Sequence, residues 1–242
     1  MTHPRIFSTV TELGQHAAQL LADAAAQAVA GRGRFVVAIS GGSLPGIIAP
    51  PLLAEPLRSR LPWPACHLFF ADERCVPLDD PESNYRLVRE QLLNRLPVPP
   101  GQIYPIDPAL SPAAAAEVYA AQLRRIFGDA PAPPRFDAVL LGMGPDGHTA
   151  SLFPGHPLLA EHTRWVAPIT NSPKPPPRRI TLTLPLLNAA RLVIFIATGS
   201  NKAEVLPRVL LPNATLPAGL VRPASGQLHW LVDAAAAAGL SN

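Results

Sequence analysis

Short runs of consecutive apolar residues recur along this chain and alternate with longer segments of helical pattern. An apolar run bounded by turn residues is typical of a strand that is covered on both faces. The four clearest runs, each with one polar or charged residue at or next to its start, are residues 34–39, 67–70, 136–141 and 191–197. Because strand and helix alternate, the pattern predicts an α/β fold in which a mostly parallel sheet lies between layers of helices.

The helical segments have recognisable ends. The longest, residues 11–30, is rich in alanine and leucine and is followed by Gly31 and Gly33, which commonly end a helix. Further helices are predicted over residues 84–94, 112–127, 202–210 and 234–238. Proline clusters at 97–100 and 173–177 mark connectors, because proline neither donates to a sheet nor continues a helix. No internal repeat or long tether is found, which predicts one domain over residues 1–242.

Composition narrows the classes of function. With 242 residues, 48% of them hydrophobic and 15% charged, the chain can bury a large core. Its formal net charge of +3 comes without a run of Lys or Arg, so we expect a small acidic ligand and no nucleic acid. Cys66 and Cys75 fit neither a disulfide framework nor a metal site. We therefore expect no metal and ordinary cytosolic thiols.

One segment has the length of a membrane span. Residues 35–54 carry no charge, but glycines and prolines interrupt them, and they are predicted to form a buried strand, a loop and a helix. The first residues are not followed by a long apolar run, so no secretory signal is expected. These observations predict a cytoplasmic protein without a membrane partner, which we expect to be a monomer or a weak homo-oligomer.

Small and charged residues follow each apolar run directly, at residues 40–45, 71–74, 142–148 and 198–202. Ligands of open α/β sheets bind outside the carboxyl ends of the strands, so these loops are predicted to form one composite site. The turn Gly41-Gly42-Ser43 lets backbone amides approach an anion at a helix start, as in a phosphate cradle. The alternative is that glycine and a Ser cap serve the turn alone.

His148 is the best candidate for general acid/base chemistry, because an imidazole with an ordinary pKa near ~6.5 transfers protons both ways at neutral pH. Asp146 adds an acceptor beside it. The glycines at 142, 144 and 147 formally match a dinucleotide fingerprint, but Pro154 cuts the segment that follows and no acid stands at the ribose position. NAD is therefore not expected. The same glycines favour amides aimed at an oxyanion.

Several cations lie near the ends of the predicted strands: Arg74, Arg178, Arg179 and Lys202, with Arg86 on the helix after Asn84. Guanidinium and ammonium groups both suit phosphate, although a single arginine is more often a solvated surface charge. Asp72 and Glu73 either orient Arg74 or act as bases, and orientation is favoured beside an arginine.

Three loops resemble the 6-phosphogluconolactonase family. They are residues 41–43, residues 70–77 with 83–86, and residues 142–154, which contain the specific string Asp-Gly-His-Thr-Ala-Ser-Leu-Phe-Pro. The resemblance continues through residues 179–183, 187–190, 202–206 and 216–218. It implies a three-layer α/β/α sandwich with a Rossmann-like central sheet, the glucosamine-6-phosphate isomerase/deaminase-like fold. It also implies hydrolysis of 6-phospho-D-glucono-1,5-lactone in the oxidative pentose phosphate pathway without a cofactor.

The resemblance also implies roles for individual residues, which are assigned by their position in the matching loops. His148 is implied as the catalytic acid/base, with Asp146 beside it, and Arg74, Arg179 and Lys202 as a cationic pocket, chiefly for the phosphate. The full set expected to bind substrate is Gly41, Gly42, Ser43, Asp72, Arg74, Asn84, Arg86, Gly144, Gly147, Arg179 and Lys202. The sequence leaves open whether Arg178 or Arg179 faces inward, and which group orients His148.

The expected reaction begins when His148 takes a proton from water that attacks the lactone carbonyl. Amides of residues 142–147 stabilise the oxyanion, and the imidazolium then protonates the departing ring oxygen. One alternative is an amino-sugar phosphate deaminase or isomerase, whose similar loop continues toward Asn-Glu-Pro where this chain has Ser151 to Pro154. The other is a non-catalytic sugar-phosphate-sensing domain, for which the chain has no DNA-binding module.

Overall fold

The computed structural model describes residues 3–129 and 132–240. In this part of the chain, six strands form a parallel central sheet in the order β1-β9-β8-β5-β2-β3. Their bounds are β1 Arg5–Phe7, β2 Phe35–Ile39, β3 Cys66–Phe70, β5 Ala138–Gly142, β8 Leu192–Ala197 and β9 Gln227–Asp233. The strands β2, β3, β5 and β8 confirm the four apolar runs, whereas β1 and β9 were not predicted.

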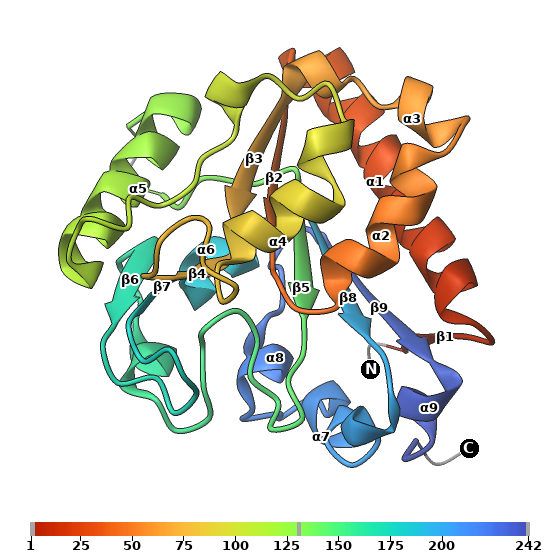
Figure 1. The fold of residues 1–242 in the computed structure, drawn as a ribbon. Helices are drawn as coiled ribbons and strands as arrows, with labels where there is room; N and C mark the ends of the chain where they lie inside the picture. The colour runs from red at the N-terminus through yellow and green to blue at the C-terminus, as the bar shows by residue number, and fades with distance from the viewer. Residues whose placement is uncertain (1–2, 130–131, 241–242) are drawn as a thin grey trace.

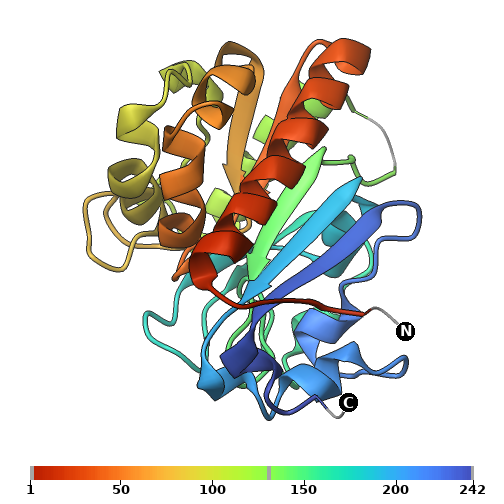
Figure 2. The same ribbon diagram turned by 90° about the vertical axis from the view of Figure 1, so that its right-hand side faces the viewer.

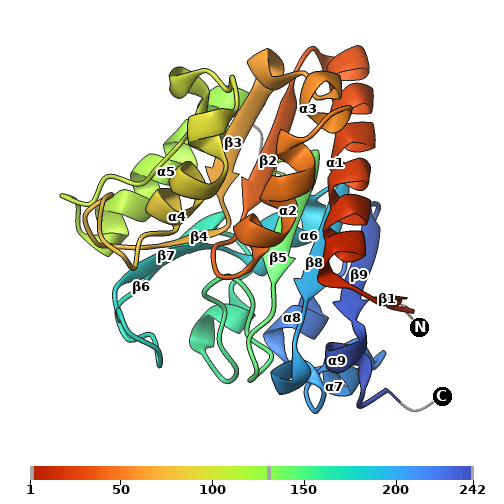
Figure 3. The same ribbon diagram turned by 45° about the vertical axis from the view of Figure 1, so that its right-hand side comes forward.

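Successive side chains of the central strands enter two different apolar cores. In β2, Val37 and Ile39 belong to one core and Val36 and Ala38 to the other. The first core is covered by α1 (Val10–Arg32), α2 (Leu44–Leu53) and α4 (Asn84–Gln91). The second is covered chiefly by α5 (Pro112–Phe127) and α6 (Leu184–Ala189). Figure 2 shows α1 lying across one face of the central sheet, and Figure 3 shows α1 and α5 on opposite sides of the central strands. This arrangement confirms the predicted sandwich.

The remaining helices are short. They are α3 Leu57–Arg60, α7 Leu206–Leu210, α8 Pro217–Leu220 and α9 Ala234–Ala237. The helix predicted over 202–210 is divided: Ser200–Lys202 form a 3-10 turn, and α7 starts anew with Pro207 in its first turn, where the missing N–H costs nothing. No helix in the described ranges is both long and apolar enough to cross a membrane.

The helix predicted over residues 11–30 is α1, which ends at Gly33 as expected, although Gly31 lies within its last turn. Thr9 caps α1 by accepting the Glu12 amide, and Gly33 ends it with φ 74°. Residues 35–54 form β2, a loop and α2, as predicted, and Pro50 and Pro51 lie inside α2. They stand in its last turn, where proline removes only the final hydrogen bonds and α2 ends three residues after Pro50.

A second, antiparallel sheet of three short strands stands beside the carboxyl edge of the central sheet (Figure 1). It consists of β4 (Asp72–Arg74), β7 (Arg179–Leu182) and β6 (Val166–Ile169). Its register places Asp72 opposite Thr181 and Arg74 opposite Arg179. This sheet was not predicted, and it brings together cations that lie about a hundred residues apart in the sequence.

Candidate active site

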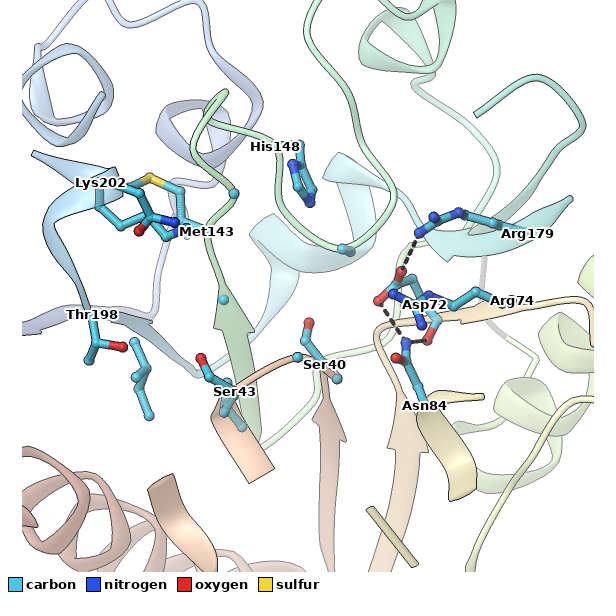
Figure 4. Close-up of a pocket in the computed structure, with 18 residues that line it drawn as sticks. Ser40, Ser43, Asp72, Arg74, Asn84, Met143, His148, Arg179, Thr198 and Lys202 are labelled. Carbon is cyan, nitrogen blue, oxygen red and sulfur yellow. Dashed lines mark hydrogen bonds and ion pairs between the residues drawn. The ribbon is translucent and has the colours of Figure 1, made fainter. Parts of the chain in front are cut away.

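A cavity of about 430 Å³ opens where the carboxyl ends of β2, β5 and β8 meet the small sheet (Figure 4). Such a crevice is the expected ligand site of a parallel α/β sheet. The composite site predicted from the loops is therefore one space in the structure. It is lined by Ser40, Gly41, Gly42, Ser43, Leu44, Asp72, Arg74, Asn84, Gly142, Met143, Gly144, His148, Ala150, Arg179, Ile196, Thr198, Asn201 and Lys202.

Most of the predicted site residues border this cavity. Asp146, Gly147 and Arg86 do not. Figure 4 shows His148 at the upper side, Lys202 on one side, and Arg74 and Arg179 on the other. A molecule in the cavity therefore has an imidazole and cations within one enclosure, which is the juxtaposition that the loop motifs predicted.

Asp146 is the group that orients His148. Its Oδ1 lies 2.5 Å from His148 Nδ1, and it also accepts the His148 backbone amide at 3.3 Å. No described residue bonds to Nε2, the other ring nitrogen. Because the carboxylate accepts the proton on Nδ1, Nε2 is left with its lone pair and can act as a base.

A lysine that the sequence analysis did not single out completes this group. Lys174 Nζ lies 3.1 Å from Asp146 Oδ2 and 3.1 Å from His148 Nδ1. It lies in the proline cluster 173–177, which the sequence predicts only as a connector. Its sequence carries no motif for a site, since the contact depends on the folding of a loop 26 residues after His148.

The charges around His148 favour a neutral imidazole beside an ionised carboxylate. Burial lowers the pKa of His148, Asp146 raises it, and Lys174 lowers it again, leaving it below the ordinary value. Burial raises the pKa of Asp146, but hydrogen bonds from His148 and Lys174 outweigh this and bring it to about 2. At neutral pH His148 is therefore ready to accept a proton.

Arg179, not Arg178, faces the interior. Arg179 is 4% exposed and Arg178 is exposed. The Arg179 guanidinium donates to the backbone oxygens of Lys174, Pro175 and Pro176 at 2.9–3.1 Å. It therefore anchors this loop and adds positive charge to the cavity wall, while few of its N–H groups remain for a ligand.

Arg74 and Arg86 differ in what they offer a ligand. Arg74 lines the cavity, and its buried Nε has no hydrogen-bond partner in the described structure. The Arg74 guanidinium also donates to the Glu82 backbone oxygen. Arg86 donates to the Asp79 backbone oxygen at 2.8 Å and to Glu90 at 2.9 Å, and it does not line the cavity. The expectation that Arg86 contacts a bound substrate is therefore not supported, because its guanidinium is held on the outer side of α4.

The two acids after β3 have separate roles. Glu73 is 1% exposed and accepts the backbone amides of Arg74, Asn84 and Tyr85 at 2.7–2.8 Å. It therefore fixes the start of α4 and does not face the cavity. Asp72 does line it, and its Oδ2 accepts the Ser151 hydroxyl at 2.6 Å.

Two amides of the loop 142–147 are used within the loop itself. The Gly144 amide donates to the His148 oxygen at 2.9 Å, and the Gly147 amide donates to the Gly144 oxygen at 3.0 Å. Both are used inside the loop, so neither is available to an oxyanion, whereas the amide of Met143, which also lines the cavity, donates to no described residue. Gly144 is required for another reason: a Cβ there would lie 2.0 Å from the His148 ring.

Further unpartnered donors are found at the start of α2. The amides of Gly42, Ser43 and Leu44 border the cavity and donate to no other described residue. The buried Ser40 hydroxyl likewise has no partner there. A helix N-terminus carries partial positive charge, so this side of the cavity suits an anion. Among the described residues no cluster of three or more His, Cys, Asp or Glu is arranged to hold a metal ion.

Known proteins share this architecture and sequence. Residues 8–230 match the family described as glucosamine-6-phosphate isomerases/6-phosphogluconolactonase. The chain is 52% identical to the 6-phosphogluconolactonase of Rattus norvegicus over 98% of this chain and 93% of the rat protein. It is also 52% identical to that of Homo sapiens, over 96% and 91%. The solved 6-phosphogluconolactonase of Trypanosoma cruzi superimposes with a TM-score of 0.86 at 30% identity, covering 100% of this chain and 99% of that one. These matches confirm the family resemblance and the fold that it implied.

Proposed function

Because this chain belongs to the family of glucosamine-6-phosphate isomerases and 6-phosphogluconolactonases, we infer that it is an enzyme that hydrolyses 6-phospho-D-glucono-1,5-lactone to 6-phosphogluconate. This reaction is a step of the oxidative pentose phosphate pathway. The observation that carries the inference is His148, which borders a cationic cavity with Nδ1 held by Asp146 and Nε2 unpartnered.

His148 is the catalytic acid/base in this proposal. Nε2 takes a proton from a water molecule while the water oxygen attacks the lactone carbonyl carbon. The tetrahedral intermediate then collapses, the bond from this carbon to the ring oxygen breaks, and Nε2–H gives its proton to that oxygen. Asp146 stabilises the imidazolium that exists between these two steps.

The cations hold the phosphorylated substrate. Arg74 and Lys202 line the cavity with no carboxylate of their own in close contact, apart from the 3.8 Å approach of Arg74 to Glu82. Burial lowers the pKa of Lys202, an effect that a bound phosphate would offset. The free amides of Gly42 and Ser43 add donors for an anionic oxygen, either of the phosphate or of the intermediate.

The decisive variant is His148→Asn. It removes the base while keeping a polar side chain, and we expect kcat/KM for freshly generated lactone to fall by ~10²–10⁴-fold relative to the wild type. Rates must be corrected for spontaneous hydrolysis. The matched control is His156→Asn in the same loop, whose imidazole bonds Asn171 and lies outside the cavity. Full activity of a folded His148→Asn enzyme would overturn the proposed function.

The two alternative functions can be tested with the same protein samples. A deaminase would release ammonia from glucosamine 6-phosphate, and a sensing domain would bind the sugar phosphate without turnover; we expect neither. We further propose that residues 1–242 act as one domain in the cytoplasm, as a monomer or weak homo-oligomer. The small net charge and the cavity at the carboxyl ends of the strands support a small-molecule substrate, and we propose no cofactor, nucleic-acid or membrane partner.

A further inference from the structure

We propose that Lys174 is a positioning residue, which clamps the Asp146 carboxylate so that His148 presents an unprotonated Nε2 to the substrate. The proposal rests on the lactonase mechanism above and assigns a role to a residue outside the cavity lining. It starts from one geometric fact: the two oxygens of Asp146 are divided between the two neighbours. Oδ1 is 2.5 Å from His148 Nδ1, and Oδ2 is 3.1 Å from Lys174 Nζ.

This division decides the tautomer of the imidazole. An ammonium group has donors only, so Lys174 could bond Nδ1, 3.1 Å away, only if Nδ1 carried no proton. The proton would then sit on Nε2, and His148 would not be a base. An ionised Asp146 so close to Nδ1 favours the opposite arrangement, in which Nδ1–H bonds Oδ1 and Lys174 bonds Oδ2. Lys174 thus holds Oδ2 of Asp146, so that the carboxylate does not rotate away from His148.

The backbone of Lys174 is held in place, unlike that of an ordinary surface lysine. The buried Arg179 bonds the Lys174, Pro175 and Pro176 oxygens at 2.9–3.1 Å. The Ser172 hydroxyl donates to the Lys174 oxygen at 2.8 Å and accepts its amide at 3.2 Å. The side chain itself is 38% exposed. A fastened backbone that presents one ammonium to the Asp146 and His148 pair is the arrangement that positioning requires.

Lys174 also acts on the proton that His148 carries. The charged groups that face His148 are Asp146 in its own loop, Lys174, and Asp72 on β4. The Phe153 ring also packs against His148, with 5.1 Å between the two ring centroids. The two carboxylates favour an imidazolium and the ammonium opposes it. Lys174 therefore limits how long the proton stays on Nε2 and helps its transfer to the departing ring oxygen.

The test is the pH profile of Lys174→Met, which removes the charge and keeps the chain length. Loss of the ammonium raises the pKa of His148, so the acid limb of kcat/KM should move to higher pH. Below that limb kcat should fall by up to ~10²-fold with little change in KM, and part of the loss should be regained at higher pH. Lys174→Arg should restore much of the activity. Arg178→Met, an exposed change four residues further on, should match the wild type.

A profile and kcat like those of the wild type would overturn the proposal. So would a rise in KM alone, which would make Lys174 a substrate ligand. If Lys174→Met does not fold, Lys174→Gln is measured in the same way. The ¹⁵N shifts of the His148 ring, measured in the wild type and in Lys174→Met, give a readout without substrate. Protonated Nδ1 in the wild type and a larger share of protonated Nε2 in Lys174→Met support the proposal, and the same tautomer populations in both proteins refute it. That readout still decides the Lys174 role if His148→Asn shows that the lactonase assignment itself is wrong.

Discussion

Asp146 and His148 are two residues apart, yet their side chains face each other with Oδ1 and Nδ1 separated by 2.5 Å. Gly147 between them adopts φ 82°, a left-handed conformation that reverses the loop and brings the two side chains to the same side. The acceptor and the base are therefore assembled by three consecutive residues, and only the lysine comes from elsewhere. This local assembly explains why the pair could be suspected from the sequence.

We expect Asp146→Asn to lower kcat/KM by ~10²–10⁴-fold. The amide has one acceptor oxygen where the carboxylate has two, so the Nδ1 proton and Lys174 compete for it, and the imidazolium loses its counter-charge. Because Asp146 raises the pKa of His148, the acid limb of the residual activity should move to lower pH, opposite to Lys174→Met. A limb that moves upward in Asp146→Asn would contradict this electrostatic account.

Arg74→Ala and Lys202→Ala should weaken binding of the phosphorylated lactone specifically. We expect each to raise KM for the phosphorylated lactone by about 10-fold or more, the scale of one charge-assisted contact, with a smaller effect on kcat. With the lactone that lacks the phosphate, each variant should match the wild type. Arg86→Ala is the control, since its guanidinium bonds Asp79 and Glu90 outside the cavity. Equal losses with both lactones would show that these cations do not hold the phosphate.

Arg179→Met should unfold more easily than the wild type by about 3–5 kcal/mol, the usual loss when one partner of a buried charge network is removed. It frees the backbone oxygens of Lys174 to Pro176 and leaves Asp72 buried without its cation. Urea unfolding measures the difference. The exposed neighbour gives the matched control: Arg178→Met should stay within ~0.5 kcal/mol. Similar losses for both variants would mean that the inward orientation of Arg179 is unimportant.

The parts of the fold that sequence patterning predicted are those whose burial is continuous. The strands β2, β5 and β8 are buried on both faces, so their apolar runs are unbroken. β9 was missed because only its second half is buried, and Gln227 and His229 interrupt the pattern. β4 was missed because Asp72-Glu73-Arg74 looks like a loop; it is a strand only because β7 pairs with it.

The site shows the same limit. His148, Arg74 and Lys202 stand directly after apolar runs, so their position at the carboxyl edge of the sheet followed from the pattern. Arg86 also lies near that edge. Its position on α4, however, directs its guanidinium away from the cavity, and a linear pattern does not show this orientation. Lys174 depends on the Arg179 contacts to its loop, and no local signal encodes those contacts. Tertiary structure therefore supplied what spacing could not.

Glu73 should make the stability of the protein depend on pH. Burial raises the pKa of this carboxyl to about 7, the amides of Asn84, Tyr85 and Arg74 oppose the rise, and Asp72 adds to it. In the unfolded chain the pKa is near the ordinary 4.5. Between these two values the native state binds more protons than the unfolded state, so this contribution to the free energy of unfolding falls as pH rises.

Glu73→Gln isolates this effect because glutamine does not titrate. We expect the free energy of unfolding of the wild type, measured relative to the variant by urea unfolding, to fall by about 3 kcal/mol between pH 4.5 and pH 7. The difference should become constant only well above pH 7, once Glu73 is fully ionised in the native state as well. The variant also replaces one acceptor oxygen by a donor against the amides of α4, which adds a constant loss of about 1–3 kcal/mol. A difference that does not change with pH would show that Glu73 is ionised throughout this range, held by the three backbone amides.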